Sequence, residues 1–413
     1  MATLIRLLAG CYCIFILELQ HRSCFEVNKT WMRETLTTRF FSPRHHAHDP
    51  AVKNETMMFI HDYLQSQGLD TRIHSFDTDL AGVKGHNVIG ILKGRQFGTV
   101  HDFPLAIGAH YDTMRTSPGV NDNGSGVTAM LEAAKVLTHT GCRPNYTLFF
   151  IASDFEEWES HGKDIACSKI ACGSRELVKT WFPKFWKDNY PANTAADNLP
   201  PFQGIIILDV VMNVDLTEKS QNVPTEFEQA FPDVMKNIIS RDGRGDFLAV
   251  IGRPEERDML DHLQTEWNNV AGNPQYHIER FNLPPIDKTP LTEKDVWSHY
   301  KNFGRSDHIS FWLSNLPAVL ITDTANFRGA MKSCYHTTCD GIALVTDDNL
   351  EFLAQTTKTI INTMGKMSGI SCLLSSTSLN FTFANIGVDW TISGFAPALV
   401  ALTTSISIGP LLL

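Results

Sequence analysis

Several stretches of this chain are almost continuously apolar over the length of a single β-strand. A strand that is apolar on both sides must be covered on both sides, which is typical of parallel sheets flanked by helices. The clearest run is FPLAIGAH, at residues 103–110. The others read HNVIGIL (86–92), TLFFIAS (147–153), GIIILDV (204–210), DFLAVIG (246–252) and PAVLIT (317–322).

Amphipathic helical patterns alternate with these strands. In ETMMFIHDYLQSQG (55–68) apolar residues recur at helical spacing before a glycine that ends the pattern. GSGVTAMLEAAKVLTHTG (124–141) and NLEFLAQTTKTIINTM (349–364) are further helices. The alternation predicts an α/β fold with a mostly parallel central sheet and helices on both faces. We expect residues 24–370 to form it as a single domain.

Composition narrows the class of protein. The chain has 413 residues, of which 43% are hydrophobic, and this is enough for a large core. Its formal net charge is −10, and no cluster of basic residues occurs in it. Because nucleic-acid binding depends on a basic surface that neutralises phosphates, we expect no nucleic-acid partner.

Both ends of the chain resemble targeting signals. Residues 1–23 carry Arg6 and then an apolar stretch shorter than a membrane span, which fits a secretory signal peptide. Residues 371–413 begin as a Ser/Thr-rich linker and end in an apolar tail, which fits a glycolipid (GPI) anchor signal with attachment near Ser375 and Ser376. A tail anchor or a weakly apolar tail is the alternative. We expect a protein that is secreted or held at the extracellular face of the plasma membrane, with membrane contact only through a C-terminal anchor.

Cysteines and glycosylation sequons agree with the secretory route. Two close cysteine pairs, Cys167/Cys172 and Cys334/Cys339, are expected to form local disulfides. Together with the sequons, they predict a disulfide-bonded glycoprotein. Asn-X-Ser/Thr sequons occur at Asn28, Asn54, Asn123, Asn145 and Asn380.

Acids and imidazoles follow the predicted strands. They occur directly after FPLAIGA, TLFFIAS and GIIIL, in the turn GVNDNGSG, and in the loop CYHTTCD beyond PAVLIT. Ligands of parallel sheets bind beyond the carboxyl ends of the strands, so we expect these side chains to share one site. The set comprises His110, Asp112, Asp122, Glu156, Glu157, Asp209 and His336.

Taken together, these residues indicate a metal site, although each motif alone has an ordinary structural interpretation. A lone His-X-Asp is more often a hydrogen-bonded pair, and paired glutamates usually lie solvated at a helix start. An aspartate after a strand is often a helix cap. Clustered anions, however, repel one another and raise one another's pKa unless a cation compensates them. Carboxylate and imidazole ligands suit zinc, with cobalt or manganese as alternatives.

The order of the motifs resembles the di-zinc aminopeptidase family of the bacterial leucine aminopeptidase type. Its relatives include glutamate carboxypeptidase, glutaminyl cyclase and the metal-free transferrin receptor. The resemblance covers residues from about 45 to 365 and rests on HYD, DNGSG, EE, LD, SDH and YHTTCD in this order. It implies a zinc-peptidase fold, peptide substrates and two zinc ions per chain.

The resemblance also implies a set of metal ligands. Asp122 would bridge the two zinc ions, and the peptide bond that follows it would be cis. Glu157 and His336 would complete the coordination of one ion. His110 and Asp209 would complete that of the other.

Two further residues receive roles from the resemblance. Asp112 would orient the imidazole of His110, and Glu156 would be the general base for hydrolysis by a metal-bound hydroxide. Successive side chains on an extended chain point in opposite directions. Glu157 can therefore face the metal while Glu156 faces the attacking water.

The leading prediction is a zinc metalloexopeptidase, most simply an aminopeptidase that hydrolyses N-terminal residues. The first alternative is a glutaminyl-peptide cyclotransferase with a single zinc ion, because that branch keeps much of the ligand set and also has a longer loop after the paired glutamates. The second alternative is a binding protein on an inactive enzyme fold. It is disfavoured because no ligand position of the family is lost.

Three segments are longer than in simple members of the family. They span residues 158–172, 181–201 and 253–302, and we expect them to form rims of the cleft that set substrate choice. The side chain that stabilises the oxyanion of the reaction is expected among Tyr276, Tyr300 and His308.

Overall fold

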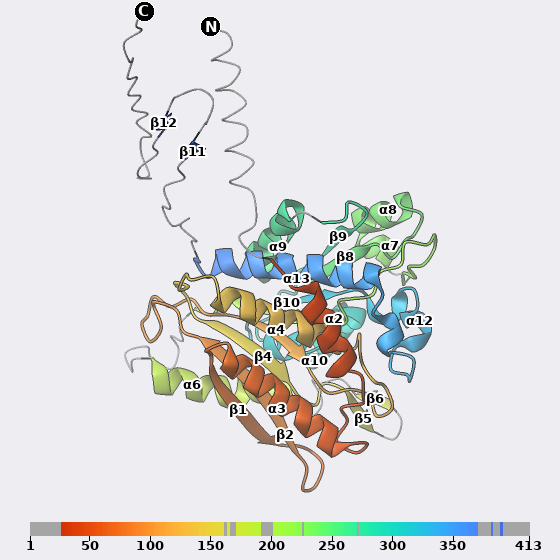
Figure 1. The fold of residues 1–413 in the computed structure, drawn as a ribbon. Coiled ribbons are helices and arrows are strands. Elements are labelled where there is room, and N and C mark those ends of the chain that lie inside the picture. Colours follow the sequence, from red (N-terminus) through yellow and green to blue (C-terminus); the bar gives the residue numbers. More distant parts are fainter. Residues whose placement is uncertain are drawn as a thin grey trace, which may run out of the picture. The chain divides into compact units, whose positions relative to one another are not determined.

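The computed structural model of the chain forms two units, residues 1–370 and residues 371–413 (Figure 1). It describes residues 26–160, 163–165, 171–190, 201–224, 227–270, 272–370, 381–382 and 389–390. The described residues of the second unit form two antiparallel strands, β11 (Phe381–Thr382) and β12 (Asp389–Trp390). The predicted signal peptide and most of the predicted C-terminal tail lie outside the described residues.

A mixed sheet of eight strands forms the centre of the first unit (Figure 1). Its strand order is β1-β2-β4-β3-β7-β10-β8-β9. The four central strands β4, β3, β7 and β10 are parallel, and antiparallel pairing occurs at β1–β2, β2–β4 and β10–β8. The strands are β1 (Asp70–Asp77), β2 (Lys84–Leu92), β3 (Leu105–His110), β4 (Leu148–Ser153), β7 (Gly204–Leu208), β8 (Phe247–Gly252), β9 (His277–Asn282) and β10 (Ala318–Thr322).

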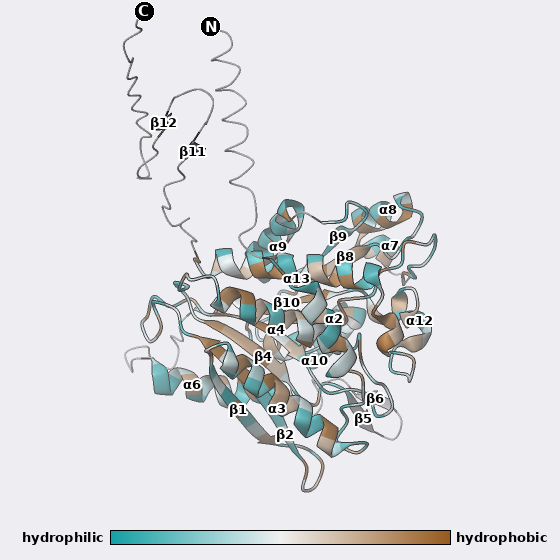
Figure 2. Cartoon of the chain, in the orientation of Figure 1, coloured by the Kyte–Doolittle hydropathy of each residue, from teal (hydrophilic) through white to brown (hydrophobic). Residues whose placement is uncertain are grey.

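Every strand expected from an apolar run is present, and the predicted fold class is confirmed. The edge strands β1 and β9 were not predicted, because they lack a continuous apolar run. Figure 2 shows this difference, since β4 is coloured as hydrophobic whereas β1 is largely hydrophilic. A small hairpin of β5 (Trp158–Ser160) and β6 (Lys163–Ile165) was also missed.

Helices cover both faces of the sheet, as expected. On one face α3 contacts β2 and α4 contacts β3 and β4, and on the other face aromatic residues of α6 and α11 join the main hydrophobic cluster. None of the described helices is both long enough and apolar enough to cross a bilayer. The α-helices are α2 (Lys29–Thr38), α3 (Pro50–Ser66), α4 (Gly124–Thr138), α5 (Gly173–Glu176), α6 (Phe182–Asn189), α7 (Phe227–Ala230), α8 (Pro232–Ser240), α9 (Arg257–Asn269), α10 (Glu293–His299), α11 (His308–Trp312), α12 (Met331–Cys334) and α13 (Asp347–Met367). Shorter helical turns are η2 (Leu177–Trp181), η3 (Pro254–Glu256), η4 (Lys301–Phe303), η5 (Ala325–Phe327) and η6 (Ile342–Leu344).

The expectation that residues 181–201 form a rim of the cleft is wrong for their first half. Phe182, Phe185 and Trp186 lie on one face of α6 and are buried. Their rings pack around Phe149 of β4, with centroids 5.3–5.8 Å away. The spacing i, i+3, i+4 of these aromatic residues is the helical pattern that could have revealed a core helix. Residues 191–200 lie outside the described part of the chain.

Candidate metal centre

The parallel core strands bring three candidate ligands to one edge of the sheet. His110 is the last residue of β3, Glu157 follows β4, and Asp209 directly follows β7. Strand β3 lies between β4 and β7 and pairs with both in parallel. The carboxyl ends of the three strands therefore meet at the same place, as the sequence predicted.

Asp122 reaches the same place from the turn before α4. The side chain of Asn123 caps α4, because its Oδ1 accepts the N–H of Gly126 at 3.1 Å and that of Val210 at 3.2 Å. Its Nδ2 donates to the carbonyl of Leu208 at 2.7 Å. Asn123 thus ties the start of α4 to the loop after β7. A Cβ atom on Gly126 would lie 2.7 Å from the Leu208 carbonyl oxygen, so only glycine fits there.

His336 comes from the loop after α12. The same loop fixes the backbone beside Asp122, because the carboxylate of Asp340 accepts the N–H of Asn121 at 2.7 Å and the N–H of Asp122 at 2.9 Å. The peptide bond between Asp122 and Asn123 is cis, as the family resemblance implied.

The two oxygens of Asp122 face different histidines. His110 Nε2 lies 3.5 Å from Asp122 Oδ1 and 3.4 Å from Asp209 Oδ1. His336 Nε2 lies 3.3 Å from Asp122 Oδ2 and 3.1 Å from Glu157 Oε1. The structure therefore brings all five predicted ligands together as two groups of three that share Asp122. Their role as metal ligands stays a prediction.

Asp112 contacts this cluster differently from the expectation. His110 Nδ1 donates to the backbone carbonyl of Asp112 at 3.2 Å, whereas the nearest carboxylate oxygen of Asp112 is 3.6 Å away. The carboxylate instead accepts the backbone N–H of Glu156 at 3.2 Å and that of Glu157 at 3.0 Å. Asp112 therefore orients both the imidazole of His110 and the backbone of the paired glutamates.

The electrostatics of the cluster favour a bound cation. Burial raises the pKa of Glu157 to about 8; His336 opposes the shift, and the neighbouring charge of Asp122 adds to it. Burial also raises the pKa of the half-buried Glu156 well above its usual value, against the effect of His110. Asp122 Oδ2 is buried and receives no hydrogen bond. Carboxylate and imidazole donors around such an oxygen fit a zinc site, and the candidate ligand atoms of His110, Asp122 and Glu157 all lie within 4.8 Å of one another.

The comparison with known families addresses the same part of the chain. Residues 87–244, which include His110, Asp122, Glu157 and Asp209, match the model of Peptidase family M28. This segment of the chain is that of a family M28 peptidase. The family suspected from the order of the motifs is thereby confirmed.

Other proteins are similar to this chain in sequence or in fold. The uncharacterized protein YfbL of Escherichia coli (strain K12) is 24% identical over 284 residues, which cover 67% of this chain and 70% of YfbL. A glutaminyl cyclase of Porphyromonas gingivalis superposes with a TM-score of 0.53 at 15% identity, covering 83% of this chain and 99% of that one. A leucine aminopeptidase precursor of Bacteroides thetaiotaomicron superposes with a TM-score of 0.52 at 15% identity, covering 82% of this chain and 97% of that one. At these identities the two structures establish only the fold that they share with this chain.

A mostly apolar pocket adjoins the candidate metal centre at Asp209. Rings of Phe227, Phe281 and Phe303 line it and pack against one another, with centroids 4.8–6.0 Å apart. Arg305 is the one cationic side chain among the lining residues. The rings form an apolar surface beside the predicted metal ligands.

The side chains expected to stabilise an oxyanion do not line this pocket. The hydroxyl of Tyr276 donates to the carbonyl of Asp348 at 3.2 Å, and that of Tyr300 donates to the carbonyl of Pro284 at 2.6 Å. His308 is fully buried. Tyr335, next to a predicted ligand, lines the pocket instead.

Arg44 is a residue of the centre that the sequence did not reveal. Its guanidinium is fully buried and donates to the carbonyls of Tyr111 at 2.6 Å, Pro118 at 2.7 Å and Gly119 at 2.8 Å. It therefore joins the strand end that carries His110 to the turn before Asp122. No motif marked Arg44, since a lone arginine in SPRHHAHD looks like an exposed loop residue.

Proposed function

We propose that the chain is a zinc exopeptidase, most simply an aminopeptidase that removes N-terminal residues from peptides outside the cell. The observation that carries this proposal is the sharing of Asp122. Each of its carboxylate oxygens faces a different histidine, and each histidine has a second carboxylate of its own. Such a donor set suits two cations better than one.

The ligands of each ion follow from these contacts. His110 and Asp209 would hold one zinc ion, Glu157 and His336 would hold the other, and Asp122 would contact both. When bound, two zinc ions supply Lewis acidity, which makes a water molecule more acidic and polarises the scissile carbonyl.

Glu156 is the proposed general base and acid. Its carboxylate is half-buried, and burial, with smaller contributions from the charges of Glu157 and Asp209, raises its pKa and so favours proton uptake. Asp112 fixes its backbone through the N–H group. The Glu156 carboxylate takes a proton from the attacking water and gives it to the amine of the departing product.

The aromatic pocket is the proposed site for the side chain of the N-terminal residue. It adjoins Asp209, and its rings from Phe227, Phe281 and Phe303 offer an apolar surface. Large apolar residues would gain most from burial there, at roughly 0.8 kcal/mol for each buried methylene group. The same pocket could instead hold the glutamine side chain in a glutaminyl cyclase, an activity carried by one of the structures that share this fold.

Turnover of two substrate classes by wild type and Glu156→Gln tests the proposal. An aminopeptidase releases the aromatic amine from aminoacyl-anilides, and this release falls at least a hundredfold in Glu156→Gln because the proton acceptor is gone. The zinc content of the variant should stay unchanged. Ammonia release from peptides with N-terminal glutamine, without hydrolysis of the anilides, would contradict the peptidase proposal and indicate a glutaminyl cyclase instead.

A further inference from the structure

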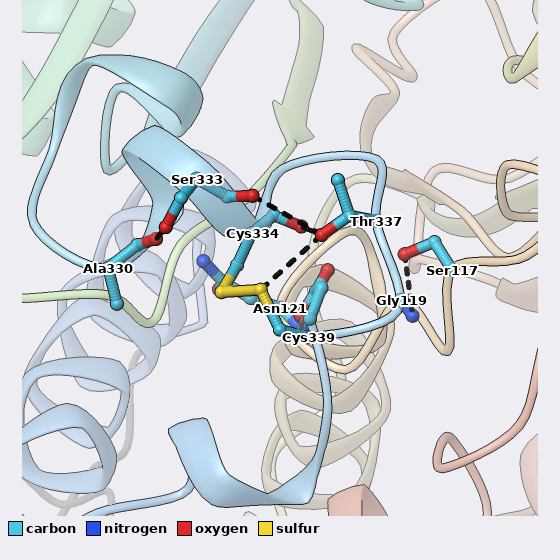
Figure 3. The surroundings of a disulfide bond; sticks show 9 residues. Ser117, Gly119, Asn121, Ala330, Ser333, Cys334, Thr337 and Cys339 are labelled. Atoms are coloured by element: carbon cyan, nitrogen blue, oxygen red, sulfur yellow. Dashed lines mark hydrogen bonds between the residues drawn. A yellow bond between two sulfur atoms is a disulfide. The ribbon is translucent and has the colours of Figure 1, made fainter.

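His336 lies in a loop that a disulfide closes. Cys334 and Cys339 are bonded (Figure 3), as expected from their spacing, and His336 lies between them in the sequence. The backbone of His336 has φ +62°, in the left-handed region that residues other than glycine avoid. Such a conformation persists only where the surroundings hold it in place.

The hydrogen bonds of Thr337, the residue after His336, are local in the sequence. The hydroxyl of Thr337 contacts the carbonyl of Cys334 at 3.0 Å, the carbonyl of Ser333 at 3.3 Å and the sulfur of Cys339 at 3.4 Å (Figure 3). The N–H of Thr337 also donates to the carbonyl of Cys334 at 3.0 Å. All of these partners lie in the loop or directly before it. The disulfide adds a covalent link that closes the loop.

Two residues of this region contact the turn that carries Asp122, one inside the disulfide-closed loop and one directly after it. On one side His336 Nε2 lies 3.3 Å from Asp122 Oδ2. On the other side Asp340, which directly follows Cys339, accepts the backbone N–H of Asp122 at 2.9 Å. The position of His336 relative to Asp340 depends on the conformation of the loop, which the disulfide constrains.

We propose that the Cys334–Cys339 disulfide is a positioning device for His336 and thereby sets the zinc affinity of one half of the metal centre. The half concerned is the group formed by Asp122, Glu157 and His336. The inference rests on the proposed function, because it assumes that this group holds zinc. His110 and Asp209 come from strand ends outside the loop, so zinc at their position is insensitive to the disulfide.

Zinc affinities of disulfide-free variants test this inference. We would compare wild type with Cys334→Ser/Cys339→Ser and Cys334→Ala/Cys339→Ala by competition with a chromophoric chelator. Circular dichroism would verify that each variant is folded. A reducing agent is unsuitable, because Cys172 is disulfide-bonded as well and would also be reduced. Thr338→Ala is the matched control, since this residue is exposed in the same loop and both cysteines remain.

The inference predicts that one of two zinc ions binds at least tenfold more weakly in both disulfide-free variants. The second ion and the Thr338→Ala control should match wild type. Unchanged affinity for both ions, or equal weakening of both, would overturn the inference. Wild type that binds no zinc would instead refute the proposed function.

A Thr337→Ala variant tests the inference without altering the cysteines. It removes the side-chain hydrogen bonds of the loop and keeps the disulfide. If the disulfide positions His336, both zinc affinities should stay within about twofold of wild type. A tenfold loss in this variant would show that hydrogen bonds, rather than the disulfide, hold the ligand.

Discussion

Asp112 and Glu157 come from the ends of neighbouring strands, and the carboxylate of Asp112 accepts the backbone N–H of Glu157 at 3.0 Å. The other oxygen of Asp112 accepts the N–H of Glu156 at 3.2 Å. These two hydrogen bonds link the end of β3 to the end of β4. It fixes where the paired glutamates lie relative to His110, which the carbonyl of Asp112 also contacts.

Asp112→Asn should weaken zinc binding and slow turnover by roughly ten- to a hundredfold each, as loss of groups that orient ligands typically does. An amide has one acceptor oxygen, so one of the two N–H groups loses its partner. Zinc competition and kcat measure the effect. The control is Asp49→Asn, because Asp49 also accepts two N–H groups, at the start of α3, and asparagine caps helices equally well. Equal effects of the two changes would contradict this role for Asp112.

Asn123 should carry no glycan in protein made through the secretory route, although it lies in a sequon. Its side chain is fully buried and makes the hydrogen bonds that tie α4 to the loop after β7. Asn54, an exposed sequon on α3, is the internal comparison. Glycopeptide mass spectrometry checks both positions. Sugar on Asn123 of active protein would contradict the site as described.

Phe227→Ala should lower kcat/KM for leucyl- and phenylalanyl-anilides by about tenfold while changing that for alanyl-anilide little. The ring of Phe227 lines the pocket beside Asp209, and a small side chain does not reach far into it. The expected loss corresponds to about 1.4 kcal/mol of apolar contact. Phe41→Ala, which removes an exposed phenylalanine, is the control. A uniform loss over all three substrates would place the N-terminal side chain elsewhere.

The free energy of unfolding should fall as the pH is lowered below about 6.5, partly through His308. Burial lowers the pKa of His308 to about 4, with Arg253 adding to this effect and Asp209 opposing it. Its Nε2 donates to the carbonyl of Phe303 at 2.6 Å, and its Nδ1 is buried without a hydrogen bond. The unfolded chain therefore binds the proton first as the pH falls, and this favours unfolding.

The size of this effect is measurable. Between pH 7.5 and 5.0 it amounts to about 2 kcal/mol, given an unfolded-state pKa of about 6.5. Urea unfolding of wild type and His308→Gln at both pH values gives the difference, in which contributions from other groups cancel. The variant should lose about 2 kcal/mol less than wild type on acidification. The same pH dependence in both proteins would exclude His308 as the source.

The sequence predicted the strands of the core and the residues at their ends, because both leave local patterns. Apolar runs marked β3, β4 and β7, and each ends next to an acid or a histidine. What it missed lacks such a pattern. Arg44 acts through backbone carbonyls, which any sequence offers, and Phe227 meets Phe303 only through the tertiary fold. Asp112 was given a role from the family, and the second contact of its carboxylate could be seen only in the structure.

The most direct test of the account is the number of zinc ions in the purified protein, measured by native mass spectrometry. We expect two per chain in wild type, and one per chain in His336→Ala and in Asp209→Asn. Asp122→Ala should lose both, since its carboxylate serves both positions. A single zinc ion in wild type that persists in His336→Ala would contradict the paired arrangement around Asp122.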